Sequence, residues 1–241
     1  MNRLYIATCG LGSWRERLAN PDRQWKRRFS ALETAVSWER ASRTSSGLPG
    51  PILELFRNSI YDEPVLMFAV AEHKVPLAGG PADSQCDVWA FLNTKVGAVS
   101  LTIEAKARES FGKSNQTLEQ WLDAGKSKRA RKNRQDRWND IKQHLPSVGE
   151  GGYSQIAYQL LHRCAAAVIE AKRLRLKNAA FVVQAFQSPE KSFDAFSQMC
   201  RTMATTAERG QMQFTNVGDI RLGIGWADCL LATDQEFAAM V

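Results

Sequence analysis

Two predicted strands each carry ionisable side chains at one end. Asp87 stands just before the apolar run 88–92, and Glu104 and Lys106 lie near the end of the run 96–107. Because a strand turns successive side chains to opposite faces, Glu104 and Lys106 share a face, with Cα atoms ~7 Å apart. Two carboxylates and an ammonium on one platform can hold a divalent metal and position an attacking water. The spacing therefore predicts the chemistry of phosphodiester hydrolysis.

The predicted metal ligands are oxygen atoms. Mg²⁺ prefers one or two carboxylates together with water and phosphate oxygens, and Mn²⁺ accepts the same kind of ligand. Asp87 and Glu104 supply the carboxylates, and the backbone carbonyl of Ala105 can add a third oxygen. Lys106 is the predicted catalytic cation, which orients the water and offsets phosphate charge. Asp83 is an alternative first acid, but Asp87 is preferred because a strand runs straight on from it.

The elements that must position these residues alternate between helix and strand. Residues 13–43 are predicted to be helical, with a buried stripe formed by Trp25, Phe29, Leu32 and Val36. The other predicted helices are 52–58, 115–124, 127–144, 153–176 and 190–208. The predicted strands are 65–75, 86–92, 96–107, 179–186 and one or two within 214–231. This order predicts an α/β fold in which helices flank a mixed central sheet.

The chain is basic, with 32 Lys and Arg against 25 Asp and Glu and a formal net charge of +7. A basic surface attracts polyanions. Segment 126–142 holds eight of the basic residues and only two Asp. We expect it to bind a phosphate backbone in a salt-sensitive and largely sequence-independent way. The predicted contacts are Lys126, Lys128, Arg129, Arg131, Lys132 and Arg134.

The predicted helix 153–176 carries polar side chains toward the same chemistry. Gln159 and Arg163 are four residues apart, so they share one face of the helix. We expect Gln159 to bind a metal-bound water and Arg163 to bind a phosphate. His162 stands between them and is interpreted as a buried histidine with satisfied hydrogen bonds.

Several other classes of function are excluded by missing patterns. The five cysteines are scattered and form no C-x-x-C, which favours a reducing compartment and argues against a structural zinc site. The apolar runs are strand-sized, so no membrane span is predicted and a cytoplasmic location is expected. The chain lacks a P-loop, a complete dinucleotide fingerprint and a G-x-S-x-G elbow, and its three histidines have no zinc spacing.

Asp87, followed on the next strand by Glu104-Ala105-Lys106 and then by an amphipathic helix, resembles the PD-(D/E)XK nuclease superfamily. More narrowly, the chain is similar to an uncharacterised bacterial family of restriction-endonuclease-like proteins. The similar stretches are residues 84–87, 102–106 with Phe111-Gly112, and 158–163, and the resemblance covers most of the chain. Cys86 departs from the superfamily motif, which has proline there, although that position varies.

The resemblance implies a single restriction-endonuclease-like domain over residues 1–241. Its αβββαβ core would span about 24–186, with a C-terminal helix and strand elaboration at 187–241. It also implies a Mg²⁺- or Mn²⁺-dependent endonuclease acting on DNA, in defence or in repair. Some superfamily members carry a further acid on the first helix, for which Glu39 is the candidate here, with Glu33 and Glu63 behind it.

Two other functions remain open from the sequence. The chain can be a nuclease-fold module without catalysis that binds nucleic acid or a protein partner, although the intact Asp, Glu and Lys set argues against this. It can also be a nuclease that cleaves RNA. The sequence leaves open the strandedness of the substrate, any sequence preference and whether the protein forms a homodimer.

Overall fold

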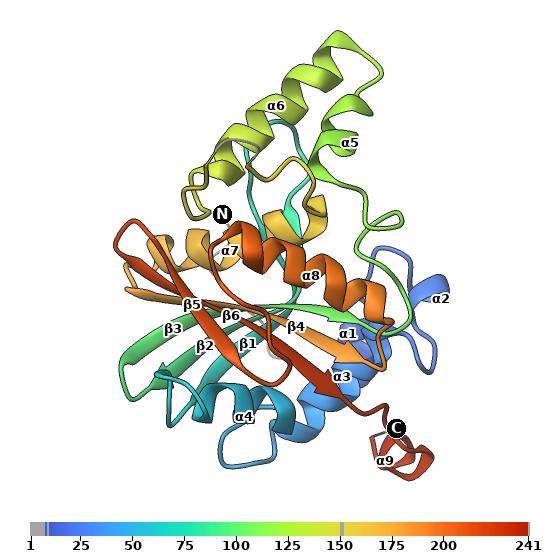
Figure 1. Cartoon of the computed structure of the whole chain (residues 1–241). Helices are drawn as coiled ribbons and strands as arrows, with labels where there is room; N and C mark the ends of the chain where they lie inside the picture. The colour runs from blue at the N-terminus through green and yellow to red at the C-terminus, as the bar shows by residue number, and fades with distance from the viewer. Residues whose placement is uncertain (1–7, 9, 150–151, 241) are drawn as a thin grey trace.

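The computed structural model describes residues 8, 10–149 and 152–240. Its centre is a six-stranded sheet with the strand order β1-β2-β3-β4-β6-β5, and Figure 1 shows it in the middle of the molecule. The β3–β4 and β4–β6 pairs are parallel and the other pairs are antiparallel, so the sheet is mixed as predicted. The strands are β1 (Val65–Val75), β2 (Ser84–Thr94), β3 (Gly97–Lys106), β4 (Asn178–Phe186), β5 (Met212–Val217) and β6 (Ile220–Cys229).

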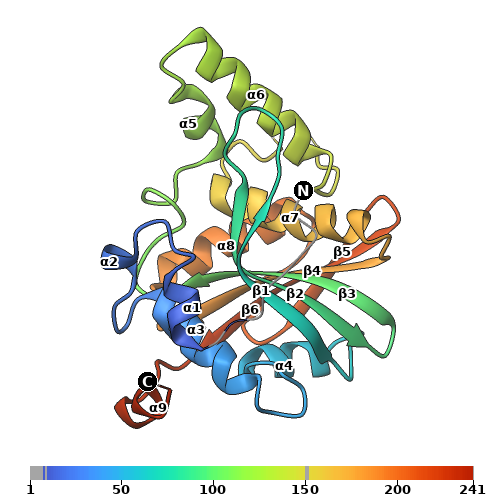
Figure 2. The same ribbon diagram turned by 180° about the vertical axis from the view of Figure 1, so that it is seen from behind.

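Helices cover both faces of this sheet (Figures 1 and 2). α3 (Ser30–Ala41) and α4 (Gly50–Arg57) lie on one face, and α7 (Tyr158–Arg173) and α8 (Glu190–Thr202) lie on the other. The fold is therefore α/β, and the order α3-β1-β2-β3-α7-β4 follows the expected αβββαβ pattern. The remaining helices are α1 (Leu11–Arg15), α2 (Pro21–Gln24), α5 (Leu118–Asp123), α6 (Lys128–Lys142) and α9 (Asp234–Ala238).

The apolar core is split into two layers by the sheet. Every residue of β4 is buried, in keeping with a parallel strand that is covered on both faces. On one side Leu160 and Phe181 belong to the cluster under α7 and α8. On the other side Leu55 and Ile103 belong to the cluster under α3 and α4. No helix in the described part of the chain is long and apolar enough to cross a membrane.

The helices α5 and α6, inserted between β3 and α7, project from the body as an arm (residues 118–142; Figures 1 and 2). The β1–β2 connection (residues 76–83) contacts this arm, since Arg137 on α6 donates a hydrogen bond to the carbonyl of Ala82. Gly79 lies so close to α6 that an added Cβ would stand 2.0 Å from the carbonyl oxygen of Asn133. Its φ of +78° is also one that glycine adopts without strain.

Two predicted helices are shorter than the sequence pattern indicated. Region 13–43 is rich in helix as predicted, with α1 and α2 ahead of α3. The amphipathic pattern starts at Trp25, but α3 begins only at Ser30, because Arg28 has a left-handed φ of 67° that a helix cannot contain. Phe29 therefore lies outside the helix and is 47% exposed, so its predicted place in a buried stripe is wrong. The long helix begins at Tyr158, since Ala157 is non-helical and bridges to Thr117.

Candidate active site

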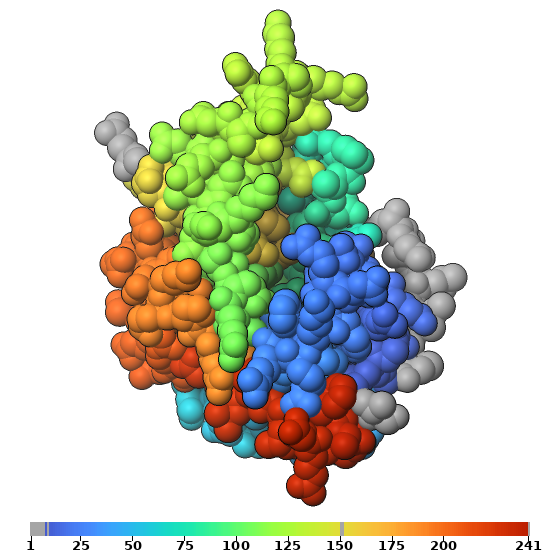
Figure 3. Space-filling model, turned by 90° about the vertical axis from the view of Figure 1, so that its right-hand side faces the viewer, coloured from blue at the N-terminus to red at the C-terminus, as the bar shows by residue number. Residues whose placement is uncertain are grey.

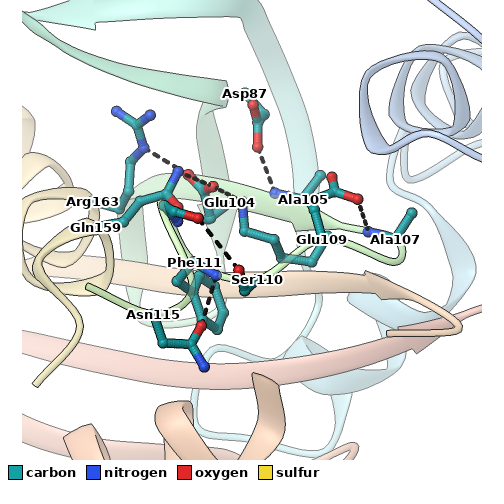
Figure 4. A network of polar contacts seen from close by, with 12 residues as sticks. Asp87, Glu104, Ala105, Ala107, Glu109, Ser110, Phe111, Asn115, Gln159 and Arg163 are labelled. Atoms are coloured by element: carbon teal, nitrogen blue, oxygen red, sulfur yellow. Dashed lines mark hydrogen bonds and ion pairs between the residues drawn. The ribbon is translucent and has the colours of Figure 1, made fainter. Parts of the chain in front are cut away.

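The predicted acids and lysine meet where β2 separates from β3. The last paired residues of these strands are Val88 and Ile103, so the amide of Ala105 has no ladder partner on β2. The carboxylate of Asp87 replaces that partner, and its Oδ2 accepts the Ala105 N–H at 2.6 Å (Figure 4). The separation opens a cavity of about 670 Å³ that Asp87, Glu104 and Lys106 all line.

Glu104 is the centre of the hydrogen-bond network in this cavity. Its Oε1 accepts from Lys106 Nζ at 2.5 Å and from Gln159 Nε2 at 2.7 Å. Its Oε2 accepts from Arg163 Nε at 2.6 Å. The Glu104 and Lys106 side chains are almost fully buried, so these charge-assisted bonds are screened little by water.

The electrostatics of the two acids differ for reasons visible in their neighbours. Burial alone would raise the pKa of Glu104, but the charges of Lys106 and Arg163 outweigh it and hold that pKa below its usual value. Burial, and then the charge of Glu104, raises the pKa of Asp87 well above its ordinary value. The ionised form of Asp87 is therefore destabilised by its surroundings, and a cation bound in the cavity would stabilise it.

Sequence reasoning missed one further acid, Glu72. Continuation of the antiparallel β1–β2 register places Glu72 opposite Asp87. Gln85 Nε2 donates to Glu72 Oε2 at 2.6 Å, and burial raises the pKa of Glu72 to about 7. The signal that could have found it was the order of the predicted strands, since 65–75 directly precedes 86–92 and an antiparallel pairing of the two would bring an acid on the first strand beside Asp87.

Gln159 connects Glu104 to the loop that follows β3. Its Oε1 accepts the Gly112 N–H at 2.5 Å while its amide donates to Glu104 (Figure 4). In the same loop, Glu109 Oε2 accepts from the Arg108 amide at 3.0 Å, and the ring of Phe111 lies 5.4 Å from Lys106 Nζ. Both polar ends of Gln159 are thus occupied, so its predicted role with a metal-bound water stays a prediction.

Arg163 is held from two sides at the same wall. Besides its contact with Glu104, its Nη1 donates to Ser84 Oγ at 3.1 Å. Ser84 Oγ also lies 2.8 Å from His162 Nδ1, and burial lowers the pKa of His162 well below its usual value. His162 is therefore a neutral, hydrogen-bonded residue, as interpreted from the sequence, and Arg163 is committed to Glu104 more than to an incoming phosphate.

Two alternative acids do not reach the cavity. Glu39 accepts hydrogen bonds from Trp14 Nε1 at 2.7 Å and from Thr8 Oγ1 at 2.8 Å, so it fastens α3 to the chain before it. Asp83 is exposed ahead of β2 and is absent from the cavity lining among the described residues. The structure thus does not bring Glu39 to the predicted metal ligands, and it favours Asp87 over Asp83.

The predicted nucleic-acid contacts of the basic segment lie on the arm, outside the cavity lining that the described residues form. Arg131 donates through Nε to the carbonyl of Gly125 at 2.9 Å, and Arg134 donates to the carbonyl of Trp121. These two arginines therefore contribute to the structure of the arm. The residues whose side chains extend into solvent are Lys126, Lys128, Arg129 and Lys132, with Lys132 paired to Asp136 at 2.8 Å.

The donor atoms in the cavity fit a hard divalent cation. No group of three or more His, Cys, Asp or Glu side chains in the described ranges is arranged to hold a metal by itself. Mg²⁺ does not require such a cage, because it usually keeps several waters and takes one or two carboxylates. Asp87 Oδ1 has no hydrogen-bond partner among the described residues, whereas both oxygens of Glu104 are already occupied.

Comparison with known proteins yields one match. The model of a family described as a domain of unknown function (DUF6946) matches residues 7–229 of the chain. No curated protein and no solved structure matches it.

Proposed function

The chain belongs to the DUF6946 family, a domain of unknown function, so we propose its activity from the site: it is a metal-dependent nuclease that hydrolyses phosphodiester bonds, most readily those of DNA. The observation that carries the proposal is the meeting of Asp87, Glu104 and Lys106 in one cavity of about 670 Å³. These residues come from two strands that diverge at that point. Hard oxygen ligands for a divalent cation beside a buried ammonium supply what phosphodiester hydrolysis needs.

The charges that line the cavity support a cation there. Four carboxylates and three cations among the described residues give the lining a net charge of −1, although the whole chain carries +7. A phosphodiester would not enter such a cavity unaided, because its own charge is also negative. One bound divalent cation would change the formal net charge of the cavity from −1 to +1. The lining charges are Glu72, Asp87, Glu104, Glu109, Arg23, Lys106 and Arg163.

In this proposal Asp87 and Glu104 would hold the cation, which when bound supplies a polarised water and neutralises charge on the phosphate. The water oxygen would form a bond to phosphorus as the bond to the leaving oxygen breaks, with the proton that the water loses passing to solvent and the leaving oxygen taking a proton from solvent. Lys106 is placed by Glu104 so that its ammonium offsets the charge that develops on the phosphate. Arg163 and Gln159 orient Glu104 from the other side.

The substrate and setting follow from the surface and the cysteines. The exposed cations on the arm suit the backbone of a long polyanion. The cysteines within the described part of the chain are buried and unpaired, which agrees with a reducing, cytoplasmic location. Endonuclease action and a homodimer belong to the same proposal.

A second candidate function is a binding module without catalysis. The observation that favours it is that Lys106, Gln159 and Arg163 already occupy both oxygens of Glu104, so that a metal would have to displace one of them. Such a protein would bind nucleic acid in a salt-sensitive manner and cleave nothing. RNA cleavage is the alternative within the nuclease proposal.

The deciding experiment offers plasmid DNA, single-stranded DNA and RNA to the protein with Mg²⁺, Mn²⁺ or EDTA. We expect metal-dependent cleavage that is lost in Lys106→Met and Asp87→Asn. Lys95→Met is the matched control, because Lys95 is exposed in the β2–β3 turn at the far end of the same strands. Cleavage of no substrate, or equal cleavage by the site variants, overturns the nuclease proposal, and salt-sensitive binding in that case supports the module.

A further inference from the structure

An exposed aromatic ring lies at the edge of the cavity. Phe29 is 47% exposed and is one of the residues that line the cavity. It belongs to neither of the two large apolar clusters, and among the described residues its ring makes no aromatic or cation–π contact. The ring therefore offers an apolar face to a molecule that enters this polar cavity.

The turn that carries Phe29 has a strained backbone and is held by hydrogen bonds. Arg28 holds a left-handed φ of 67°, which a non-glycine residue adopts only when its surroundings require it. The requirement comes from Glu33, which is buried and accepts the Arg28 N–H at 2.7 Å and the Ala232 N–H at 2.8 Å. Arg27 also donates to the carbonyl of Ala232 at 2.8 Å. The position of Phe29 is therefore fixed by contacts with the C-terminal segment.

The segment that precedes this ring is rich in basic residues. Residues 13–28 carry six Lys or Arg and only two acids. Arg23, on α2, also lines the cavity and is exposed, and its guanidinium makes no ion pair within the described ranges. A flat apolar ring beside an unpaired guanidinium is the combination that binds nucleotides, because the base stacks on the ring and the phosphate takes the cation.

We propose that Phe29 is a stacking platform for an unpaired nucleobase, with Arg23 binding a neighbouring phosphate, so that the substrate is a single-stranded nucleic acid or an unpaired strand end. This inference rests on the proposed nuclease function and names its substrate class. In a continuous duplex each base face is covered by the next base pair. Only an unpaired or terminal base offers a free face to Phe29.

The size of the cavity agrees with a single strand. Its volume of about 670 Å³ lies in the range of small-molecule sites, ~300–1,000 Å³. Figure 3 shows the opening as a hollow between the blue segment of α1–α3 and the green chain that follows β3. Residues from both walls line the cavity, Leu18 and Phe29 on one side and Ser110 and Gly112 on the other.

The test measures binding in EDTA, where the proposed nuclease does not cleave. A short single-stranded DNA carrying 2-aminopurine is titrated with protein, and quenching of its fluorescence reports stacking. We expect Phe29→Ala to abolish the quenching and weaken Kd by about 5- to 150-fold, the equivalent of ~1–3 kcal/mol for one stacked base. Phe29→Trp should retain both. A relaxed, covalently closed circular duplex, which has neither strand ends nor unpaired loops, should bind Phe29→Ala and wild type equally.

Phe68→Ala is the matched control, since Phe68 is 45% exposed on β1 and does not line the cavity in the described structure. Equal behaviour of Phe29→Ala and Phe68→Ala, or equal loss of duplex and single-strand binding, overturns the inference. Its failure is distinguishable from failure of the nuclease. If Phe29 quenches the fluorescence but no substrate is cleaved, only the nuclease proposal is refuted. If the protein cleaves but Phe29→Ala binds single strands like wild type, only the stacking inference is refuted.

Discussion

Removal of the Glu104 charge should destabilise the fold because it leaves the buried cations Lys106 and Arg163 without their counter-ion. The Glu104 carboxylate contacts Lys106 at 2.5 Å and Arg163 at 2.6 Å, and the three side chains are 1%, 7% and 12% exposed. Breaking a buried ion pair from one side costs about 3–5 kcal/mol. With a urea m-value of ~2–3 kcal/mol/M, Glu104→Gln should lower the unfolding midpoint by about 1–2 M.

A double-mutant cycle separates this charge effect from general disruption. Lys106→Met keeps the apolar stem and leaves Glu104 paired with Arg163, so we expect a smaller loss of about 1–3 kcal/mol. The double variant has neither member of the pair and should be more stable than the sum of the single losses predicts, by about 1–3 kcal/mol. Urea unfolding followed by circular dichroism at pH 7 measures all four proteins.

An exposed ion pair of the same chain is the control for the cycle. Lys177 and Asp219 are in contact, but their side chains are 71% and 72% exposed, so solvent screens the attraction. The cycle of Lys177→Met and Asp219→Asn should give a coupling close to zero. A coupling at Glu104 and Lys106 that is no larger than this value refutes the reasoning, because the buried network would then hold no special electrostatic energy.

The pH dependence of the same cycle gives an independent check. The pKa of Glu104 is lower in the folded protein than in the unfolded chain, since Lys106 and Arg163 outweigh its burial. Its stabilising charge is therefore fully present above the unfolded pKa of ~4.3 and is lost as the pH falls through the folded pKa. The stability difference between wild type and Glu104→Gln should shrink over that acid range.

Three further predictions concern the acid cluster and the arm. Asp87→Asn should stabilise the fold at pH 7 by ~1 kcal/mol and raise the melting temperature by ~2–4 °C, because burial and the charge of Glu104 raise the pKa of Asp87. Melting curves at a series of pH values should show that this stabilisation vanishes below pH ~4, where Asp87 of the unfolded chain is itself protonated. Calorimetry with Mg²⁺ at ~100 times its Kd should show about 2.7 kcal/mol of stabilisation for wild type and none for Asp87→Asn, and equal stabilisation of both would place the cation elsewhere. Replacement of three exposed arm cations by Gln should reduce the log–log salt slope of single-stranded DNA binding by about 2, and an unchanged slope would exclude the arm from the interface. The three are Lys128, Arg129 and Lys132.

The sequence predicted the features that depend on local alternation. Glu104 and Lys106 were assigned to one face of a strand, and the strand fixes that relation whatever it pairs with. The nearly continuous apolar run at 179–186 predicted the buried strand β4 for the same local reason. The order of helices and strands, and with it the α/β class, also followed from the local patterns.

The features that depend on pairing or on one strained dihedral could not be predicted. Glu72 is one of 25 acidic residues, and only the β1–β2 pairing brings it to Asp87. Phe29 fits a helical stripe with Trp25 and Leu32, and the left-handed Arg28 that interrupts the stripe is imposed by the distant Ala232 through Glu33. The hydrogen-bond donors to Glu39 could not be predicted for the same reason, since Trp14 belongs to a different helix, α1, and contacts Glu39 only in the folded chain.

The three donors to Glu104 are not equally free to move. Gln159 is also held by the Gly112 amide, and Arg163 is also held by Ser84, so either one must break a second contact to leave. Lys106 has no second hydrogen bond within the described chain, and its Nζ sits over the face of Phe111. A flexible ammonium stem that faces the cavity can turn toward a substrate while Gln159 and Arg163 keep Glu104 in place. For this reason Lys106, rather than either of its neighbours, is the residue whose replacement should abolish cleavage without moving the acids.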